Sequence, residues 1–167
     1  MTNKKCVLGC LKALLIVAGL IVVDQWTKQL AVLHLQNKPP IVLIDGMLEL
    51  LYTENRGMAF GLLQNQRTIF ILVTIVVVCG LCFFYTRIPH ERRFLPIRAA
   101  VILIVAGAIG NFIDRIRLSY VIDFIYIKLI DFPVFNIADC FVTMTAFWAF
   151  LLLMFFYKEE DMKRLGL

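Results

Sequence analysis

Long apolar segments alternate with short polar ones along the chain. Two of them carry no charged residue over 18 positions, Thr68–Tyr85 and Cys140–Tyr157. A third, Ala99–Ile113, has 15 uncharged residues and follows Pro96, a residue typical of the first turn of a helix. A helix needs about 20 mainly apolar residues to cross a hydrocarbon core of about 30 Å, and the third segment reaches that length if Arg98 extends its charged group outward. We therefore predict membrane spans over 68–86, 97–114 and 137–157.

The N-terminal region predicts a first span, although a carboxylate interrupts it. Ala13–Val23 is a run of 11 apolar residues that ends at Asp24, and apolar periodicity resumes beyond it up to Leu35. As one helix, this region gives a span over 12–33 with an acidic side chain inside. A basic N-terminus before an apolar stretch is also typical of a signal peptide. Here, however, Cys10 precedes the apolar run, whereas a lipoprotein cleavage site follows it. We expect an uncleaved helix.

The segments 34–67 and 115–134 lie on the same side of the predicted membrane and have β character. Asp45-Gly46 is a strong hairpin signal. Strands are predicted on both sides of it and in the later segment: Ile41–Ile44, Met47–Tyr52 and Tyr120–Ile127. Met58–Leu63 is apolar enough to lie on the lipid surface. The fold class we predict is an integral membrane protein, mainly α, with four transmembrane helices and a small β-rich extracytoplasmic platform, forming one membrane domain over residues 1–167.

Composition agrees with a membrane protein. Of the 167 residues, 61% are apolar and 17% charged, with a mean hydropathy of +0.85. A soluble domain is about 45–50% apolar and about 25% charged, so a water-soluble globule is excluded, and disorder with it. The five cysteines are odd in number and lie in or beside apolar runs, which excludes a disulfide framework. Cys79 and Cys82 have C-x-x-C spacing, but inside an apolar segment we interpret them as packing residues.

The distribution of Lys and Arg predicts the orientation. With four spans, both termini and the loop 87–98 share one side, which holds ten Lys and Arg residues against seven on the other. This excess places both termini in the cytoplasm. The net charge of +5 then reflects topology, and no nucleic-acid partner is expected.

Carboxylates inside or at the ends of the predicted spans lie at one depth. At 1.5 Å per residue, Asp24, Asp114 and Asp139 lie about 24–28 Å from the cationic ends of their spans. All three therefore reach the outer boundary of the membrane. Polar groups in spans are costly and hence candidates for function.

Helical spacing suggests how these groups interact. Asp24 and Lys28 are four residues apart and predict an ion pair, and the start of the last helix favours the carboxylate of Asp139. Purely structural interpretations stay open: the pairs Asp24–Lys28 and Asp114–Arg115 could fix helix ends, and amides could bond neighbouring helices. Those amides are Asn111, which shares a helix face with Arg115, and Asn136.

Asp123 and Asp139 are harder to explain structurally. Neither has a basic neighbour in sequence, and both lie among Ile, Phe and Val residues, so catalysis or proton handling is a serious alternative. The only serine is Ser119, the two histidines do not form a zinc motif, and no phosphate-binding loop is present, so no metal site is predicted. Two close carboxylates can share one proton, one acting as base toward water and the other as acid toward a carbonyl.

Five motifs, in this order, resemble bacterial lipoprotein signal peptidase (signal peptidase II) along nearly the whole chain. They are Asp24-Gln25-Trp26-Thr27-Lys28, Asn55-Arg56-Gly57-Met58-Ala59-Phe60, Gly110-Asn111-Phe112-Ile113-Asp114-Arg115, Val121-Ile122-Asp123-Phe124 and Phe135-Asn136-Ile137-Ala138-Asp139. Departures are small: Arg56 and Met58 are bulky, and Gly61 stands where the family often has serine.

The resemblance implies a membrane aspartic endopeptidase that cuts diacylglyceryl-modified prolipoproteins just before the lipidated cysteine. It implies Asp123 and Asp139 as the catalytic dyad. It also implies residues that hold the dyad and the substrate or shape the site and its rim: Asn111, Asp114, Arg115, Asn136, Asp24, Lys28, Asn55 and Gly57. No cofactor is expected.

The setting expected for this enzyme is the bacterial cytoplasmic membrane, with several spans and a site near the outer leaflet. Prolipoproteins and membrane lipids would be its partners, and we expect a monomer. Two other functions remain open. Intramembrane carboxylates also serve proton-coupled transporters, although no inverted repeat is apparent here. A scaffold that binds lipoproteins without cutting them would need the platform but not two aspartates.

Overall fold

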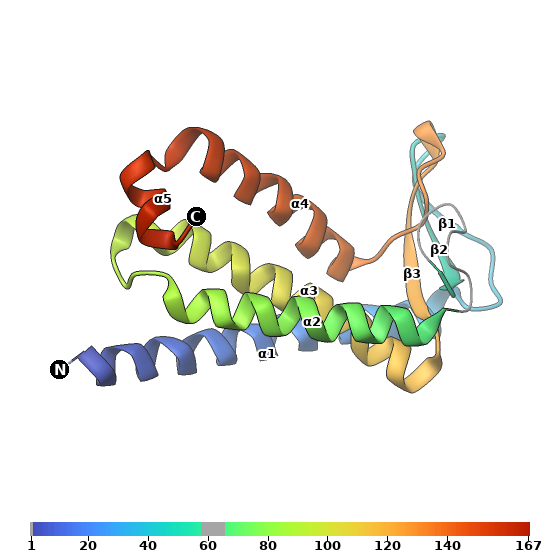
Figure 1. Cartoon of the computed structure of the whole chain (residues 1–167). Helices are drawn as coiled ribbons and strands as arrows, with labels where there is room; N and C mark the ends of the chain where they lie inside the picture. The colour runs from blue at the N-terminus through green and yellow to red at the C-terminus, as the bar shows by residue number, and fades with distance from the viewer. Residues whose placement is uncertain (1, 58–65) are drawn as a thin grey trace.

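Four long helices form the body of the protein (Figure 1). The computed structural model describes residues 2–57 and 66–167, so Met58, Gly61 and the apolar segment expected at the lipid surface lie outside the described residues. The long helices are α1 (Thr2–Leu35), α2 (Arg67–Arg87), α3 (Leu95–Leu118) and α4 (Ile137–Leu151), which a π-helical turn extends over Leu152–Phe156. All four are long and apolar enough to cross a membrane. The predicted fold class, a mainly helical membrane protein, is confirmed.

The central helix is α3, against which α1, α2 and α4 all pack. It contributes most of the buried helical residues, among them Ala100, Val101 and Ala106. By contrast, α2 has no fully buried residue: one side of the helix is half-buried against α3, and the remaining apolar side chains are exposed. An apolar helix with so much exposed surface suits a lipid environment. α1 is one continuous helix, as predicted, and carries Asp24 within it.

A three-stranded antiparallel sheet lies at one end of the helices (Figure 1). Its order is β1 (Ile41–Ile44), β2 (Leu48–Asn55) and β3 (Val121–Ile127). β1 and β2 form the predicted hairpin, in which Gly46 takes a φ of +67° that side chains disfavour.

β3 is the strand that joins the sheet to the helices. Ile122 and Phe124 pack with Ala31 and Leu35 near the end of α1. A bridge between Ile125 and Phe135 ties β3 to the chain that leads into α4. This packing brings the middle of β3 beside the start of α4.

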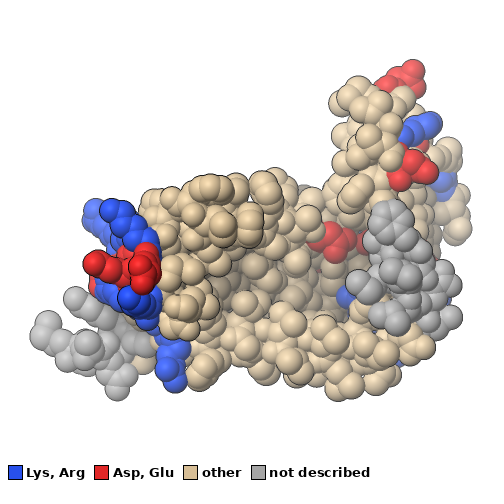
Figure 2. Space-filling view, turned by 45° about the horizontal axis from the view of Figure 1, so that its top comes forward, with Lys and Arg blue, Asp and Glu red and all other residues tan. Residues whose placement is uncertain are grey.

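Both termini lie at the opposite end from the sheet (Figure 1). There a short helix, α5 (Glu159–Leu165), which the sequence did not predict, closes the bundle. Asp161 of α5 accepts hydrogen bonds from Arg93 Nε at 2.8 and 2.9 Å, and the ring of Phe94 stacks on that of Tyr157. Figure 2 shows the basic and acidic residues gathered at this end, beside an almost uncharged body.

Candidate active site

Asn136 is hydrogen-bonded to both predicted catalytic carboxylates. Its side-chain Nδ2 donates to Asp123 Oδ1 at 2.6 Å, and its backbone N–H donates to Asp139 Oδ2 at 3.1 Å. Asn136 is fully buried, and Asp123 is 1% exposed. The two aspartates, 16 residues apart in sequence and on different elements, therefore meet at one residue.

Local structure at the start of α4 fixes the orientation of Asp139. Asn136 is the N-cap residue, and its side-chain oxygen accepts a hydrogen bond from Asp139 N–H at 3.0 Å. In turn, the backbone N–H of Asn136 donates to the Asp139 carboxylate, and the two hydrogen bonds together form a capping box. A carboxylate in this first turn is also favoured by the helix dipole.

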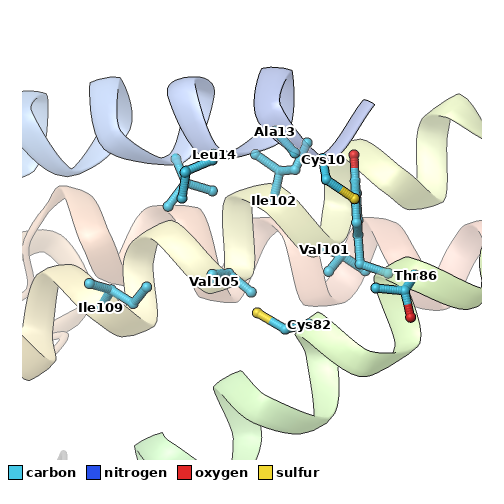
Figure 3. A pocket seen from close by; sticks show the side chains of 11 residues that line it. Cys10, Ala13, Leu14, Cys82, Thr86, Val101, Ile102, Val105 and Ile109 are labelled. Carbon is cyan, nitrogen blue, oxygen red and sulfur yellow. The ribbon is translucent and has the colours of Figure 1, made fainter. Parts of the chain in front are cut away.

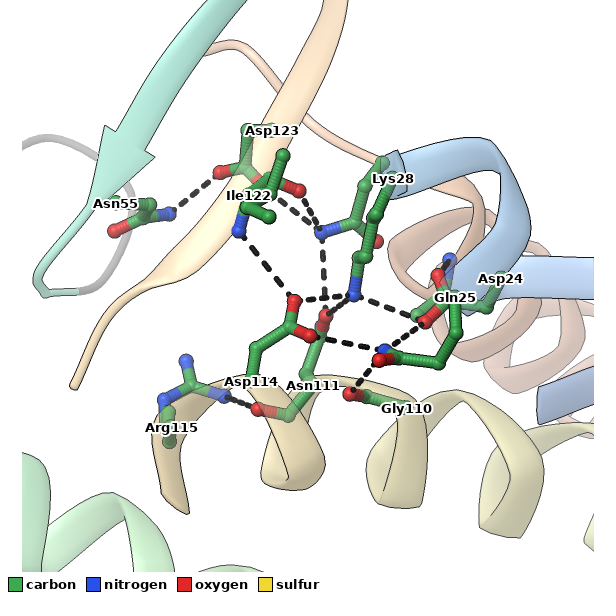
Figure 4. Close-up of polar contacts among 12 residues, drawn as sticks. Asp24, Gln25, Lys28, Asn55, Gly110, Asn111, Asp114, Arg115, Ile122 and Asp123 are labelled. Carbon is green, nitrogen blue, oxygen red and sulfur yellow. Dashed lines mark hydrogen bonds and ion pairs between the residues drawn. The ribbon is translucent and has the colours of Figure 1, made fainter. Parts of the chain in front are cut away.

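Asp123 is held from the other side by β2. Asn55 Nδ2 donates to Asp123 Oδ2 at 2.8 Å (Figure 4). Asn55 Oδ1 accepts from the Gly57 N–H at 3.1 Å. Burial and the charge of Asp139 raise the pKa of Asp123 to about 7, although the Asn55 and Asn136 hydrogen bonds act to lower it. A carboxyl group with such a pKa carries its proton through part of the neutral range.

Asn111 connects the carboxylates to a buried lysine. Its Nδ2 donates to Asp139 Oδ1 at 2.7 Å, and its Oδ1 accepts from Lys28 Nζ at 2.8 Å and from Asn136 Nδ2 at 3.2 Å. Both hydrogen-bonding atoms of this amide are thus used.

Lys28 lies in a buried ionic cluster behind the two carboxylates (Figure 4). Its Nζ lies 3.0 Å from Asp24 Oδ2 and 2.8 Å from Asp114 Oδ2, and its side chain is 1% exposed. Asp24 also accepts a hydrogen bond from the Ala138 N–H at 3.1 Å, next to the start of α4. The predicted Asp24–Lys28 ion pair is present. Asp24 and Lys28 are buried, so they lie behind the site and not at a rim.

The sequence-based pairing of Asp114 with Arg115 is wrong. Asp114 pairs with Lys28, and the Arg115 guanidinium lies 4.8 Å from the ring centre of Phe70 on α2. Arg115 Nη1 also donates to the Asn111 carbonyl at 3.4 Å. Adjacent residues on a helix point about 100° apart, so tertiary contacts decide their partners.

The backbone of Ile122, the residue before Asp123, is held through both its N–H and its carbonyl group. The Ile122 N–H donates to Asp114 Oδ2 at 3.4 Å, and the Ile122 carbonyl accepts from Asn136 Nδ2 at 3.3 Å. The ionic cluster and the helix cap therefore fix the backbone that carries Asp123.

A cavity of about 620 Å³ opens beside Asp139 and beside Asn55, the hydrogen-bond partner of Asp123. Asn55, Arg115 and Asp139 contribute polar groups to its lining. The rest is mainly apolar. Gly57 and, from α2, Phe70 contribute to it, and the other residues come from the segment before α4 and from α4 itself: Phe132, Pro133, Val134, Phe135, Cys140, Thr143 and Met144. Figure 2 shows acidic atoms in a hollow between the helical body and the sheet. Within the described residues, no group of three or more His, Cys, Asp or Glu could hold a metal ion.

Comparison with known proteins identifies the family. The model of signal peptidase (SPase) II matches residues 16–156. The chain belongs to the signal peptidase II family. The lipoprotein signal peptidase of Streptococcus thermophilus (strain CNRZ 1066) is 39% identical over 145 residues, which cover 87% of this chain and 92% of that protein. The lipoprotein signal peptidase of Geobacillus thermodenitrificans is 42% identical over 148 residues, covering 87% of this chain and 91% of that protein.

Solved structures agree with this assignment. A bacterial membrane enzyme determined by the in meso method at 1.9 Å resolution superposes with a TM-score of 0.76 at 30% identity, covering 87% of this chain and 94% of that one. A second such enzyme, at 2.3 Å resolution, gives a TM-score of 0.75 at 31% identity, covering 86% and 87%. The resemblance seen in the sequence is confirmed, and the chain is a bacterial membrane protein of a protease family.

Two residues within the signal peptidase II motifs, Gln25 and Gly110, make contacts that the sequence did not predict. Gln25 Nε2 donates to Asp114 Oδ1 at 2.9 Å and to the Gly110 carbonyl at 3.2 Å, which joins α1 to α3. A Cβ atom on Gly110 would lie 2.5 Å from Asp24 Oδ2, so only glycine allows the helices to approach so closely here. Both residues stand inside the quoted motifs, but only the packing of α1 on α3 shows what they contact.

Proposed function

We propose that this signal peptidase II family member is an aspartic endopeptidase with Asp123 and Asp139 as its catalytic dyad. Its substrates are diacylglyceryl-modified prolipoproteins, which it cuts immediately before the lipidated cysteine. The observation that carries this proposal is the double contact of Asn136, which holds Asp123 close to Asp139, the carboxylate that lines a large cavity.

In the reaction, the two carboxylates share one proton. Asp123 holds it at neutral pH, since burial and the charge of Asp139 raise its pKa to about 7. Asp139, which lines the cavity, takes a proton from a water molecule, and Asp123 donates its own to the carbonyl oxygen of the scissile peptide. The tetrahedral intermediate then collapses as Asp139 gives the proton taken from water to the leaving amine, and a hydroxyl of the intermediate returns a proton to Asp123. No covalent bond to the protein forms.

The surrounding residues bind and orient. Arg115 faces the cavity and can donate to substrate carbonyls, while Asn55 and Gly57 form the adjacent wall. Asn111 and Asn136 fix the carboxylates through the hydrogen bonds described above. The cluster of Lys28, Asp24 and Asp114 keeps the amide of Asn111 and the backbone of β3 in place.

The orientation follows from the charges. The ten Lys and Arg residues on the side of the termini support an orientation with both ends in the cytoplasm, the sheet outside and the site near the outer leaflet of the cytoplasmic membrane. There the lipid anchor of a translocated prolipoprotein lies within reach. The 167 residues act as one monomeric membrane domain, with membrane lipids and prolipoproteins as partners and no cofactor or nucleic acid.

The test is cleavage by the purified protein in lipid or detergent. A diacylglyceryl-modified prolipoprotein, its unlipidated form, and the variants Asp123→Asn and Asp139→Asn are compared by gel shift and by mass of the products. Asp131→Asn removes an exposed carboxylate on the sheet side and is the matched control. We expect a product beginning with the lipidated cysteine from the parent and the control alone.

Each other outcome contradicts a stated part of the proposal. Equal cleavage of the unlipidated substrate overturns the substrate class, and an active Asp123→Asn or Asp139→Asn variant overturns the dyad. Binding of the substrate without cleavage by the folded parent would favour a scaffold.

A further inference from the structure

A second cavity lies in the half of the bundle nearer the termini, away from the candidate active site. It has a volume of about 270 Å³ and lies between α1, α2 and α3 (Figure 3). Both α1 and α2 pack on α3 but barely contact each other, which leaves this space between them. Ala13 of α1, Cys82 of α2 and Val105 of α3 are among the residues that line it.

Water is a poor occupant for this cavity. A buried water needs two to four polar partners, and the surface that lines the cavity is almost entirely apolar. The Thr86 hydroxyl is already bonded to the Phe83 carbonyl at 2.7 Å. Because the cavity lies among helices that are long and apolar enough to span a membrane, the acyl chains of the bilayer are the apolar groups that can fill it.

A buried cation lies next to one wall of the cavity. Arg98 is 6% exposed, and its guanidinium lies 4.3 Å from the ring centre of Tyr85, which lines the cavity. Arg98 Nη1 donates to the Ile88 carbonyl at 3.1 Å. It forms no ion pair with a carboxylate in residues 2–57 and 66–167, whereas Arg93 and Arg164 at the same end are paired with Asp161 and Glu91.

The approach of α1 places this cation at the junction of the three helices. A Cβ atom on Gly9 would lie 3.1 Å from His90 Nε2 and 3.4 Å from Arg98 Nη2. Burial and the charge of Arg98 lower the pKa of His90, so the imidazole is neutral at pH 7 and Arg98 carries the positive charge. A buried charge is costly unless a group of opposite sign accompanies it.

We propose that this cavity binds one acyl chain of an anionic membrane phospholipid, whose phosphate pairs with Arg98. The apolar walls contact the chain, and the cation favours a headgroup of net negative charge over a zwitterionic one, whose own cation would lie close to Arg98. This lipid site is separate from the carboxylate site and does not depend on the proposed reaction.

The first test fills the cavity. Native mass spectrometry of the protein from mixed micelles with equal amounts of phosphatidylglycerol and phosphatidylcholine should show one retained phosphatidylglycerol. Cys82→Trp, which places a large side chain in the cavity from an exposed position, should abolish retention. Cys79→Trp is the matched control, since Cys79 is exposed on the same helix one turn earlier and does not line the cavity.

The second test removes the charge. Arg98→Gln should lower the preference for phosphatidylglycerol over phosphatidylcholine about fivefold, the factor that one Lys or Arg contributes near an anionic surface. Arg92→Gln removes an exposed charge from the same end and should leave the preference unchanged.

Several results would overturn the lipid site. These are equal retention of both lipids by the parent, equal loss in the two tryptophan variants, and equal effects of the two arginine variants. Retention of a second copy of the chain in place of lipid would also do so. If Arg98→Gln does not fold, the comparison of the tryptophan variants still decides.

Discussion

The side-chain amide of Asn136 donates a hydrogen bond of 2.6 Å to Asp123, across 13 residues of sequence. The same residue caps α4 through its side-chain oxygen and so orients Asp139. Helix capping and carboxylate positioning therefore use opposite ends of one amide. These two roles can be separated, because serine caps a helix as well as asparagine does but has no amide donor.

Asn136→Ser should consequently lower kcat without unfolding the protein. Loss of the hydrogen bond to Asp123 misplaces one member of the proposed dyad, and positioned acid–base groups contribute about 10²–10⁴-fold to rates. We expect a fall of about 10²-fold in kcat. Asn136→Ala, which also loses the cap, should in addition lower the free energy of unfolding by about 1 kcal/mol. Steady-state cleavage and thermal unfolding measure the two effects, and an unchanged kcat in the serine variant would refute the positioning role.

The pH dependence of cleavage should have an alkaline limb near pH 7. Asp123 must hold a proton to act as an acid, and its pKa is raised to about 7 by burial and by Asp139. Above that pH, kcat/KM should fall tenfold per unit. The Asn55 hydrogen bond acts to lower the pKa of Asp123, so Asn55→Ala should move the limb to higher pH. A limb that moves to lower pH, or a rate that is flat up to pH 9, contradicts this assignment of the proton.

The stability of the folded protein should fall over the same range. The pKa of Asp123 lies at about 7 when folded and at about 3.9 in an unfolded chain. Between these values the folded state binds more protons, so the free energy of unfolding decreases as pH rises. From pH 5.5 to 7 the loss is about 1.6 kcal/mol, because the slope of about 1.36 kcal/mol per pH unit halves at the folded pKa.

Thermal unfolding in detergent at several pH values tests this loss. Asp123→Asn removes the titration and should flatten the profile, while Asp131→Asn, an exposed control, should keep the parental slope. Equal slopes in the parent and in Asp123→Asn would show that another group is responsible.

Much of the fold follows from local sequence, whereas the pairing of charges inside it does not. Apolar run lengths predicted the four helices, and Asp45-Gly46 predicted the hairpin, because span length and turn geometry are local properties. The partner of Asp114 lies 86 residues away, at Lys28, and is fixed only when α1 packs on α3. The short helix α5 was missed for a similar reason, since contacts from Arg93 hold it and it has no apolar run of its own.

Replacing Lys28 should show how strongly the ionic cluster holds the site. Lys28→Met keeps the apolar stem but leaves the buried carboxylates of Asp24 and Asp114 without their cation. Breaking a buried ion pair from one side costs about 3–5 kcal/mol. The double variant Lys28→Met/Asp114→Asn leaves one fewer unpaired charge and should recover part of that loss. Denaturant unfolding of the two single variants and the double variant gives the coupling energy. Additive losses would show that Lys28 and Asp114 do not interact.

Gly110 offers a steric test of the same packing. In Gly110→Ala the new Cβ would lie 2.5 Å from Asp24 Oδ2, and Asp24 is fully buried in the Lys28 cluster, so α1 and α3 must separate. We expect a loss of stability of about 1–3 kcal/mol, typical of overpacking, together with a lower kcat. Gly80→Ala is the matched control, because a Cβ there meets nothing within 4 Å and alanine favours a helix over glycine by up to about 1 kcal/mol. Thermal unfolding and cleavage should therefore differ between the two variants. The Gly80→Ala control should be at least as stable as the parent and fully active. If Gly110→Ala matches the control in both measurements, close contact between α1 and α3 is not what holds the carboxylates in place.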